Sequence, residues 1–150
     1  MALALMLRLR AAGEAMPTSA ALLSPWVDLT CSGSSIDTNA DDYLDRAILE
    51  RFAGHYLQGA DPAEPEVSPV FADLRGLPPM LLITGGSEVF LDENLRLADV
   101  ARAAGCEVTL RVGEGMVHAW PAFAAMVPEA RIALGEVGAF LSHHAASEPH

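Results

Sequence analysis

Residues 79–86, Pro-Met-Leu-Leu-Ile-Thr-Gly-Gly, decide the fold class. An apolar run of this length closed by two glycines is typical of a strand buried on both faces of a parallel sheet. Residues 19–24 (SAALLS) form a similar run, which Pro25 ends. Residues 107–112 instead alternate polar and apolar side chains, which predicts a half-exposed strand at a sheet edge.

Helical patterns separate these three strands. Residues 2–12 are predicted to form a helix, as are 46–58, a segment ending at Gly105, and a last segment opening at Pro128. The apolar positions expected to face the core are Leu49, Phe52, Ala53 and Tyr56, then Leu97, Val100, Ala101 and Ala104, and finally Ala133, Val137, Phe140 and Leu141. Residues 59–78, rich in proline, connect two elements irregularly. Strands alternating with helices predict an α/β fold with a parallel sheet.

Two elements carry more apolar surface than this chain can cover. Strand 19–24 has the composition of a central strand, yet no earlier strand precedes it to pair with its other edge. Helix 2–12 is apolar around nearly its whole circumference, which is typical of a helix buried on several sides. We therefore interpret residues 1–142 as part of a larger catalytic domain, followed by a polar tail at 143–150.

The composition excludes several functional classes. The 150 residues carry 9 basic and 20 acidic side chains, a formal net charge of −11, with 51% hydrophobic residues. Such a chain forms a core, and its charge disfavours nucleic acid and anionic membrane surfaces. The opening MALALMLRLR places its arginines after the apolar run and is too short to span a bilayer, so we expect no signal peptide and no membrane span. Two cysteines without metal or disulfide spacing favour the cytoplasm.

Two side chains at strand ends are candidates for chemistry. Glu88 follows the strand at 79–84, and His118 lies in the loop GEGMVHAW after the strand at 107–112. Because parallel strands end at the same edge of a sheet, Glu88 and His118 are predicted to lie close together, and the carboxylate would orient the imidazole as a general base. A purely structural loop histidine is the alternative. Asp92 is interpreted as a helix N-terminal residue.

This order matches part of a serine-hydrolase triad. α/β-Hydrolases carry Ser, then Asp or Glu, then His along the chain, with the serine in a G-x-S-x-G turn. The sequence has the second and third members, but neither a G-x-S-x-G nor an H-G-G-G motif. The tail histidines, His143, His144 and His150, lack the spaced partners of a metal site, and His55 in helix 46–58 is interpreted as a surface or interface residue. We expect neither a metal nor an organic cofactor.

Several motifs in order resemble one family. LLSPWVDLT (22–30), DPAEPEVSPVFADLRGLPPMLLITGG (61–86), EVFLDENLRLADVARAAGCEVTL (88–110) and GMVHAW (115–120) are similar to the hormone-sensitive-lipase-like, or family IV, esterases of the α/β-hydrolase fold. The resemblance runs from Ala2 to about Leu141. It implies the C-terminal part of that fold, about three parallel strands with flanking helices, with the N-terminal strands and the cap missing and the nucleophile turn placed just before Met1.

The resemblance also implies roles for residues. Aligning Asp92 and Glu93 with the family's D-E pair puts Glu88 at the triad acid, and the family histidine falls on His118. Trp120, Phe123 and Phe90 would line the substrate pocket. The substrate would be a small ester with a short acyl group, the missing N-terminal half would be a partner, and homodimers would form through strand 107–112 or the last helix.

A different class of function stays open. The chain would then be a catalytically inactive, truncated remnant that acts as an interaction module, or an artefact of the gene model. The coding sequence upstream of Met1 would separate these interpretations, because an in-frame nucleophile turn there would complete the triad.

Overall fold

The computed structural model describes residues 1–39 and 44–146. It contains three strands, five α-helices and two short 3-10 helices within those residues. In chain order they are α1 (Ala2–Ala12), β1 (Ala20–Leu23), α2 (Ser35–Thr38), α3 (Arg46–Leu57), η1 (Pro69–Phe71), β2 (Met80–Gly85), α4 (Leu91–Ala103), β3 (Val108–Gly113), η2 (Trp120–Phe123) and α5 (Pro128–Ala145).

The strands form one parallel sheet in the order β1-β2-β3. Met80 of β2 is level with Ala20 of β1 and with Val108 of β3. Every residue of β2 is buried, as the continuous apolar run predicted for a strand covered on both faces. The predicted edge position of β3 is confirmed. Among the described residues β1 is the opposite edge, and no strand pairs with its outer side.

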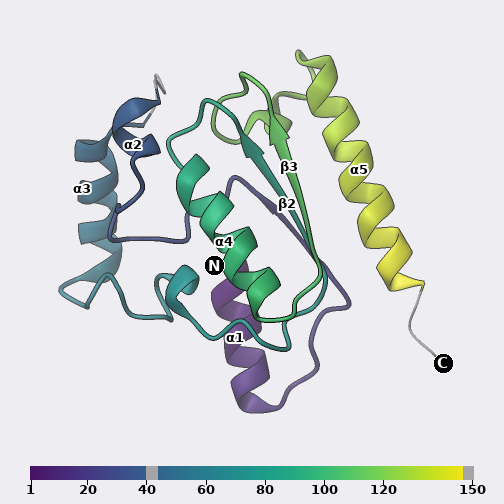
Figure 1. The fold of residues 1–150 in the computed structure, drawn as a ribbon, viewed down its shortest axis with the longest axis horizontal. Coiled ribbons are helices and arrows are strands. Elements are labelled where there is room, and N and C mark those ends of the chain that lie inside the picture. Colours follow the sequence, from purple (N-terminus) through teal and green to yellow (C-terminus); the bar gives the residue numbers. More distant parts are fainter. Residues whose placement is uncertain (40–43, 147–150) are drawn as a thin grey trace.

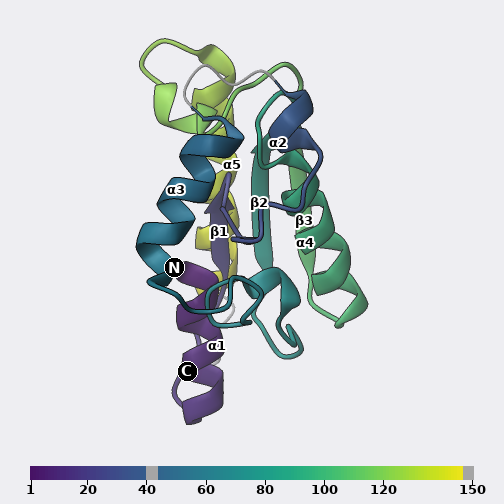
Figure 2. The same ribbon diagram turned by 90° about the vertical axis from the view of Figure 1, so that its left-hand side faces the viewer.

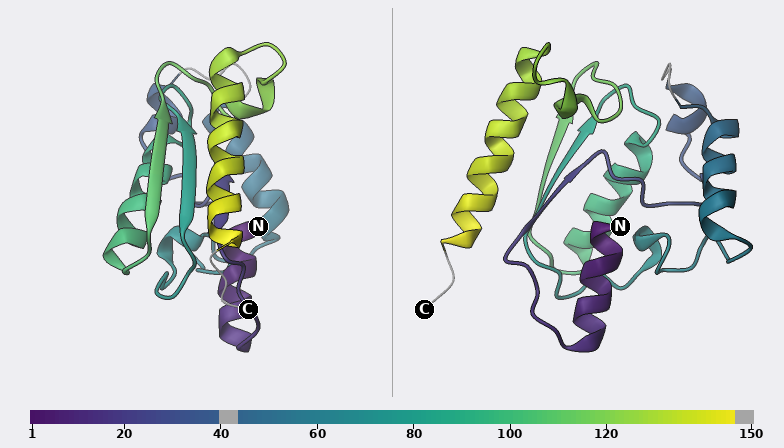
Figure 3. Two further views of the ribbon diagram at one scale, coloured as in Figure 1. Left: turned by 90° about the vertical axis from the view of Figure 1, so that its right-hand side faces the viewer. Right: turned by 180° about the vertical axis from the view of Figure 1, so that it is seen from behind.

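Helices cover both faces of the sheet (Figure 1, and Figure 3 in its left view). On one face α1 and α4 pack against alternate residues of β2, with Leu3, Leu82 and Leu97 all buried in one cluster. On the other face α5 and η2 pack against Leu81 and Ile83. The period-two alternation of β2 therefore serves two separate cores, one on each side.

Helix α3 packs less apolar surface than its periodicity predicted. Leu49 and Ala53 are buried, but Phe52 is 47% exposed and Tyr56 is 58% exposed. The helix lies to one side of the sheet (Figure 1 and the right view of Figure 3; Figure 2 shows it from the near side), and Leu49 belongs to a small buried cluster that includes Cys31, Ile36 and Phe90. The prediction that Phe52 and Tyr56 face the core was wrong for this chain, because no described element covers that side of α3.

The last helix also differs from the expectation. Leu141 is 39% exposed, so its predicted burial was wrong, whereas Ala133 is buried. Helix α5 continues to Ala145, three residues into the expected polar tail, and residues 147–150, with His150, lie outside the described residues. Among the described residues, no helix has both the length and the apolar character needed to cross a membrane.

Candidate active site

The candidate site lies at the carboxyl ends of the three strands. Ser24 directly follows β1, Glu88 follows β2 after a short turn, and His118 lies in the loop after β3. The loops after β2 and β3 emerge side by side at one end of the sheet (Figure 1). Open α/β sheets bind ligands at this end, beyond the carboxyl ends of their strands. The structure therefore brings Glu88 and His118 together, as the strand order predicted.

Glu88 is a fully buried carboxylate with two unlike oxygens. Its Oε2 accepts hydrogen bonds from the Gly85 backbone N–H and from the Ser24 hydroxyl, both at 2.6 Å. Its Oε1 lies 3.7 Å from Nδ1 of His118. Neither Oε1 nor Nδ1 has a hydrogen-bond partner, and both atoms are buried. The separation is longer than the expected 2.6–3.2 Å of a hydrogen bond, so the two atoms face each other without a formed bond.

The imidazole of His118 is held on one side by an aromatic pair. The imidazole and the ring of Phe90 make a T-shaped contact with centroids 5.1 Å apart, and Phe90 stacks on Trp26 at 5.4 Å. The His118 side chain keeps 30% of its surface exposed. The ring is thus fixed against a hydrophobic wall while remaining accessible from outside.

Glycine permits the close approach of the two loops. A Cβ on Gly85 would lie 2.2 Å from the carbonyl oxygen of Met116 and 2.7 Å from that of Val117. The loops are further joined by hydrogen bonds from the Gly86 N–H to the Gly113 oxygen and from the Ser87 N–H to the Met116 oxygen. A side chain at position 85 would therefore push the histidine loop away from Glu88.

Asp92 has different partners. Its Oδ2 accepts hydrogen bonds from the Ser34 hydroxyl at 2.5 Å and from the Ser35 N–H at 2.9 Å. The bond from Ser34 is the main reason that the pKa of the Asp92 carboxyl lies below its usual value. The carboxylate joins the first turn of α4 to the start of α2, as expected for a helix N-terminal residue.

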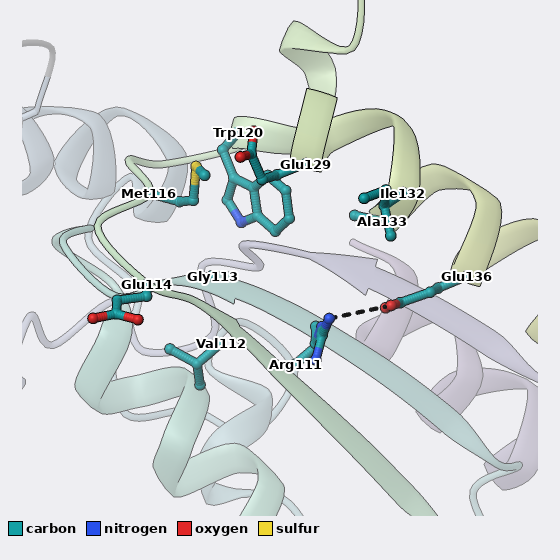
Figure 4. A pocket seen from close by; sticks show the side chains of 10 residues that line it. All are labelled: Arg111, Val112, Gly113, Glu114, Met116, Trp120, Glu129, Ile132, Ala133 and Glu136. Carbon is teal, nitrogen blue, oxygen red and sulfur yellow. Dashed lines mark ion pairs between the residues drawn. The ribbon is translucent and has the colours of Figure 1, made fainter. Parts of the chain in front are cut away.

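The three residues expected to line a substrate pocket lie in different surroundings in the described structure. Trp120 lines a cavity of about 330 Å³ between β3 and α5, together with Arg111 and Glu136, whose ion pair is drawn in Figure 4. Neither His118 nor Glu88 lines that cavity. Phe90 is instead buried between Trp26 and His118, and Phe123 is half-buried in η2.

Two buried polar groups near the site were not predicted from the sequence. Ser24 contacts the Glu88 carboxylate, and the only signal was its place at a strand end. Glu93 is 3% exposed, its Oε1 accepts a hydrogen bond from the Val27 N–H at 2.6 Å, and burial raises the pKa of its carboxyl to about 9. Within residues 1–39 and 44–146 no group of three His, Cys, Asp or Glu side chains is arranged to hold a metal ion.

Comparison with known proteins identifies the family. Residues 1–122 match the family model described as the alpha/beta hydrolase fold. The chain belongs to the alpha/beta hydrolase fold family. Within it, the chain is 41% identical to an acetyl-hydrolase of Streptomyces hygroscopicus over 143 residues, covering 94% of this chain and 48% of that protein. It is 38% identical to an esterase of Acinetobacter venetianus, covering 93% and 47%.

Solved structures of hydrolases agree with this assignment. A crystal structure of the esterase EstE5 matches with a TM-score of 0.94 and 40% identity, covering 97% of this chain and 50% of that one. An esterase of the bacterial hormone-sensitive lipase family matches with a TM-score of 0.92 and 39% identity, covering 95% and 48%. The resemblance to that family and the partial α/β-hydrolase fold are confirmed. The chain spans about half the length of the relatives that it matches.

Proposed function

We propose that this chain supplies the acid and the histidine of a carboxylic-ester hydrolase. The observation that carries the proposal is the buried Glu88 carboxylate, whose Oε2 is fully engaged while Oε1 faces Nδ1 of His118 with no other partner. An acceptor in that position favours the tautomer with a proton on Nδ1, which leaves the second ring nitrogen free to take a proton.

In this mechanism His118 acts twice. In acylation it removes the proton from the attacking serine hydroxyl and gives it to the leaving alkoxide, so that the alcohol departs. In deacylation it removes a proton from the water that attacks the acyl-enzyme and returns it to the serine, which releases the acid. Glu88 stabilises the imidazolium that forms in each half-reaction. The 150 residues contain no G-x-S-x-G turn, so the serine and the oxyanion-hole donors come from outside this sequence. Neither a metal ion nor an organic cofactor enters the proposed mechanism.

The substrate class follows from the named relatives. Two of them are an acetyl-hydrolase and an esterase, which supports small esters with short acyl groups as substrates. The cysteines Cys31 and Cys106 are both free and buried, which favours a reducing compartment, and we place the chain in the cytoplasm.

A chromogenic short-chain ester tests this proposal. The 150-residue chain is assayed alone and after refolding with the complementary N-terminal half of a close relative. We expect no triad hydrolysis by the chain alone, because removing a triad nucleophile costs on the order of 10⁶ in turnover. The reconstituted mixture should be active, and His118→Ala should abolish that activity.

Two outcomes would count against the proposal. Substantial hydrolysis by the chain alone, lost in His118→Ala, would mean that a nucleophile exists within these residues. A folded, reconstituted complex without activity would instead favour the inactive interaction module. His55→Ala is the matched control, because His55 lies on α3 and outside the candidate site.

We also propose that copies of the chain associate through β3 and α5. In the described sheet β3 is an edge, Val112 is 42% exposed on it, and Ile132 is 61% exposed on α5. The ion pair between Arg111 and Glu136 joins these two elements into one surface. An unpaired edge beside exposed apolar side chains favours association.

A further inference from the structure

The hydroxyl of Ser24 lies between the acid and the histidine loop. Its Oγ donates a hydrogen bond to Oε2 of Glu88 at 2.6 Å and accepts one from the backbone N–H of Ala119 at 3.0 Å. Ser24 is only 3% exposed. Both the proton and a lone pair of this hydroxyl are therefore committed, one to the acid and the other to the residue that follows His118.

The backbone at Ser24 adopts a conformation that serine rarely takes. Its φ is +44°, in the left-handed region, and its N–H donates to the carbonyl oxygen of Ile83 at 2.7 Å. Ala119, at the other end of the contact, also has a positive φ of +52°. Non-glycine residues hold such a conformation only where surrounding contacts enforce it, and these positions cluster at functional sites.

The hydroxyl decides which oxygen of Glu88 faces the histidine. Ser24 and the Gly85 N–H together engage Oε2, so Oε1 is left for Nδ1 of His118. Without the hydroxyl, a single backbone bond would hold the carboxylate, and the carboxylate could rotate about its last torsion. The N–H of Ala119 would lose its partner at the same time, which loosens the loop that carries the imidazole.

We propose that Ser24 is a positioning residue of the ester-hydrolase site, one hydroxyl that fixes Glu88 and the His118 loop relative to each other. This inference rests on the proposed function of the pair. It assigns to β1 a part in the site, although β1 carries neither the acid nor the histidine.

Two variants at position 24 separate positioning from folding. Ser24→Ala removes the hydroxyl and keeps the Cβ, whereas Ser24→Gly removes the hydroxyl at a φ that glycine adopts without strain. The matched control is Ser35→Ala. Ser35 is equally buried at 3%, donates to the Val89 oxygen and accepts from the Asp92 N–H, but it makes neither of the contacts that hold Glu88 and Ala119.

The first readout is steady-state hydrolysis by the reconstituted enzyme. The concentration of active sites, needed to calculate kcat, is measured with a phosphonate that labels the serine. We expect kcat to fall roughly 10- to 100-fold in Ser24→Ala and in Ser24→Gly, with KM unchanged within about twofold. Ser35→Ala should keep kcat within about twofold of the wild type even where it lowers the unfolding temperature.

The second readout uses the 150-residue chain alone. The long-range ¹H–¹⁵N NMR spectrum reports the tautomer of the His118 ring, and the share of the ring with its proton on Nδ1 should fall in both Ser24 variants and stay unchanged in Ser35→Ala. An inactive wild-type mixture would contradict the proposed function, while the spectra would still decide whether Ser24 positions the pair. The assignment of Ser24 would be overturned if the Ser24 variants of an active enzyme kept their kcat, or if their spectra were unchanged. It would also be overturned if Ser35→Ala lowered kcat as much as the Ser24 variants do.

Discussion

Oε1 of Glu88 and Nδ1 of His118 face each other at 3.7 Å, buried and without any other hydrogen-bond partner. A buried carboxylate oxygen without a partner is costly, and so is a buried ring nitrogen. A shift of less than 1 Å would satisfy both atoms with a single bond. This geometry supports the proposed pairing of Glu88 with His118, because catalytic hydrogen bonds often shorten to their working length only in complexes.

The contact should shorten in the assembled site. We expect a crystal structure of the reconstituted enzyme, with a phosphonate on its serine, to show Oε1 of Glu88 within about 3.2 Å of Nδ1 of His118. The same structure should keep Asp92 bonded to Ser34. A structure with Asp92 at the imidazole and Glu88 in solvent would reverse the assignment of the acid.

Gly85 should not tolerate a side chain. In Gly85→Ala the new Cβ would meet the carbonyl oxygens of Met116 and Val117, so we expect a loss of about 3 kcal/mol in the free energy of unfolding, measured with urea. Gly138→Ala is the control, because nothing lies within 4 Å of its Cβ position in α5 and alanine favours a helix by up to about 1 kcal/mol. Equal effects at both glycines would show that the loops after β2 and β3 are not packed closely at Gly85.

The buried Glu93 should make stability fall as the pH rises. Burial raises the pKa of this carboxyl from 4.5 to about 9, so between those values the folded chain holds a proton that the unfolded chain releases. The stability of the wild type therefore decreases across this window, whereas Glu93→Gln is neutral throughout. The free energy of unfolding of Glu93→Gln, measured with urea and taken relative to the wild type, should therefore rise by at least about 1.4 kcal/mol from pH 5 to pH 8.

The exposed Glu107 provides the control for this titration. Glu107→Gln should run parallel to the wild type over the same pH range. If the difference between Glu93→Gln and the wild type stays constant with pH, Glu93 is ionised in the folded chain, and the account of its burial fails.

The association of copies should depend on the β3 edge. In sedimentation experiments we expect the wild type to form dimers and Val112→Asp to remain monomeric, because the substitution puts a charge on the exposed part of that strand. Leu95→Asp, at a residue of α4 that is 37% exposed, should leave the dimer intact. A monomeric wild type, or equal losses in the two variants, would count against this surface.

Much of the site could be predicted because its frame is a parallel sheet. The run PMLLITGG marks β2 as central, and the carboxyl ends of neighbouring parallel strands must meet, which placed Glu88 beside His118. Asp92 was correctly interpreted as an N-terminal residue of α4. Its actual partner, Ser34, comes from a segment 58 residues earlier, and no periodicity indicates that contact.

The parts that could not be predicted depend on backbone conformation and on covering elements. The proposed role of Ser24 requires a positive φ at a strand end, which the sequence Ser24-Pro25 does not specify. The exposure of Phe52 and Tyr56 escaped prediction because helical periodicity shows which residues share a face, not what covers that face. The substrate pocket expected at Trp120, Phe123 and Phe90 stays a prediction; in the described residues Trp120 packs between the sheet and α5.

The most direct test of the account compares two carboxylates in the reconstituted enzyme. Glu88→Gln keeps the shape of the side chain but removes the charge that orients His118, so kcat should fall on the order of 10⁴-fold, as amide replacement of a triad acid does. Asp92→Asn should lower stability by about 1 kcal/mol and leave kcat within about twofold. Full activity in Glu88→Gln, or its loss in Asp92→Asn, would contradict the claim that Glu88 is the partner of His118.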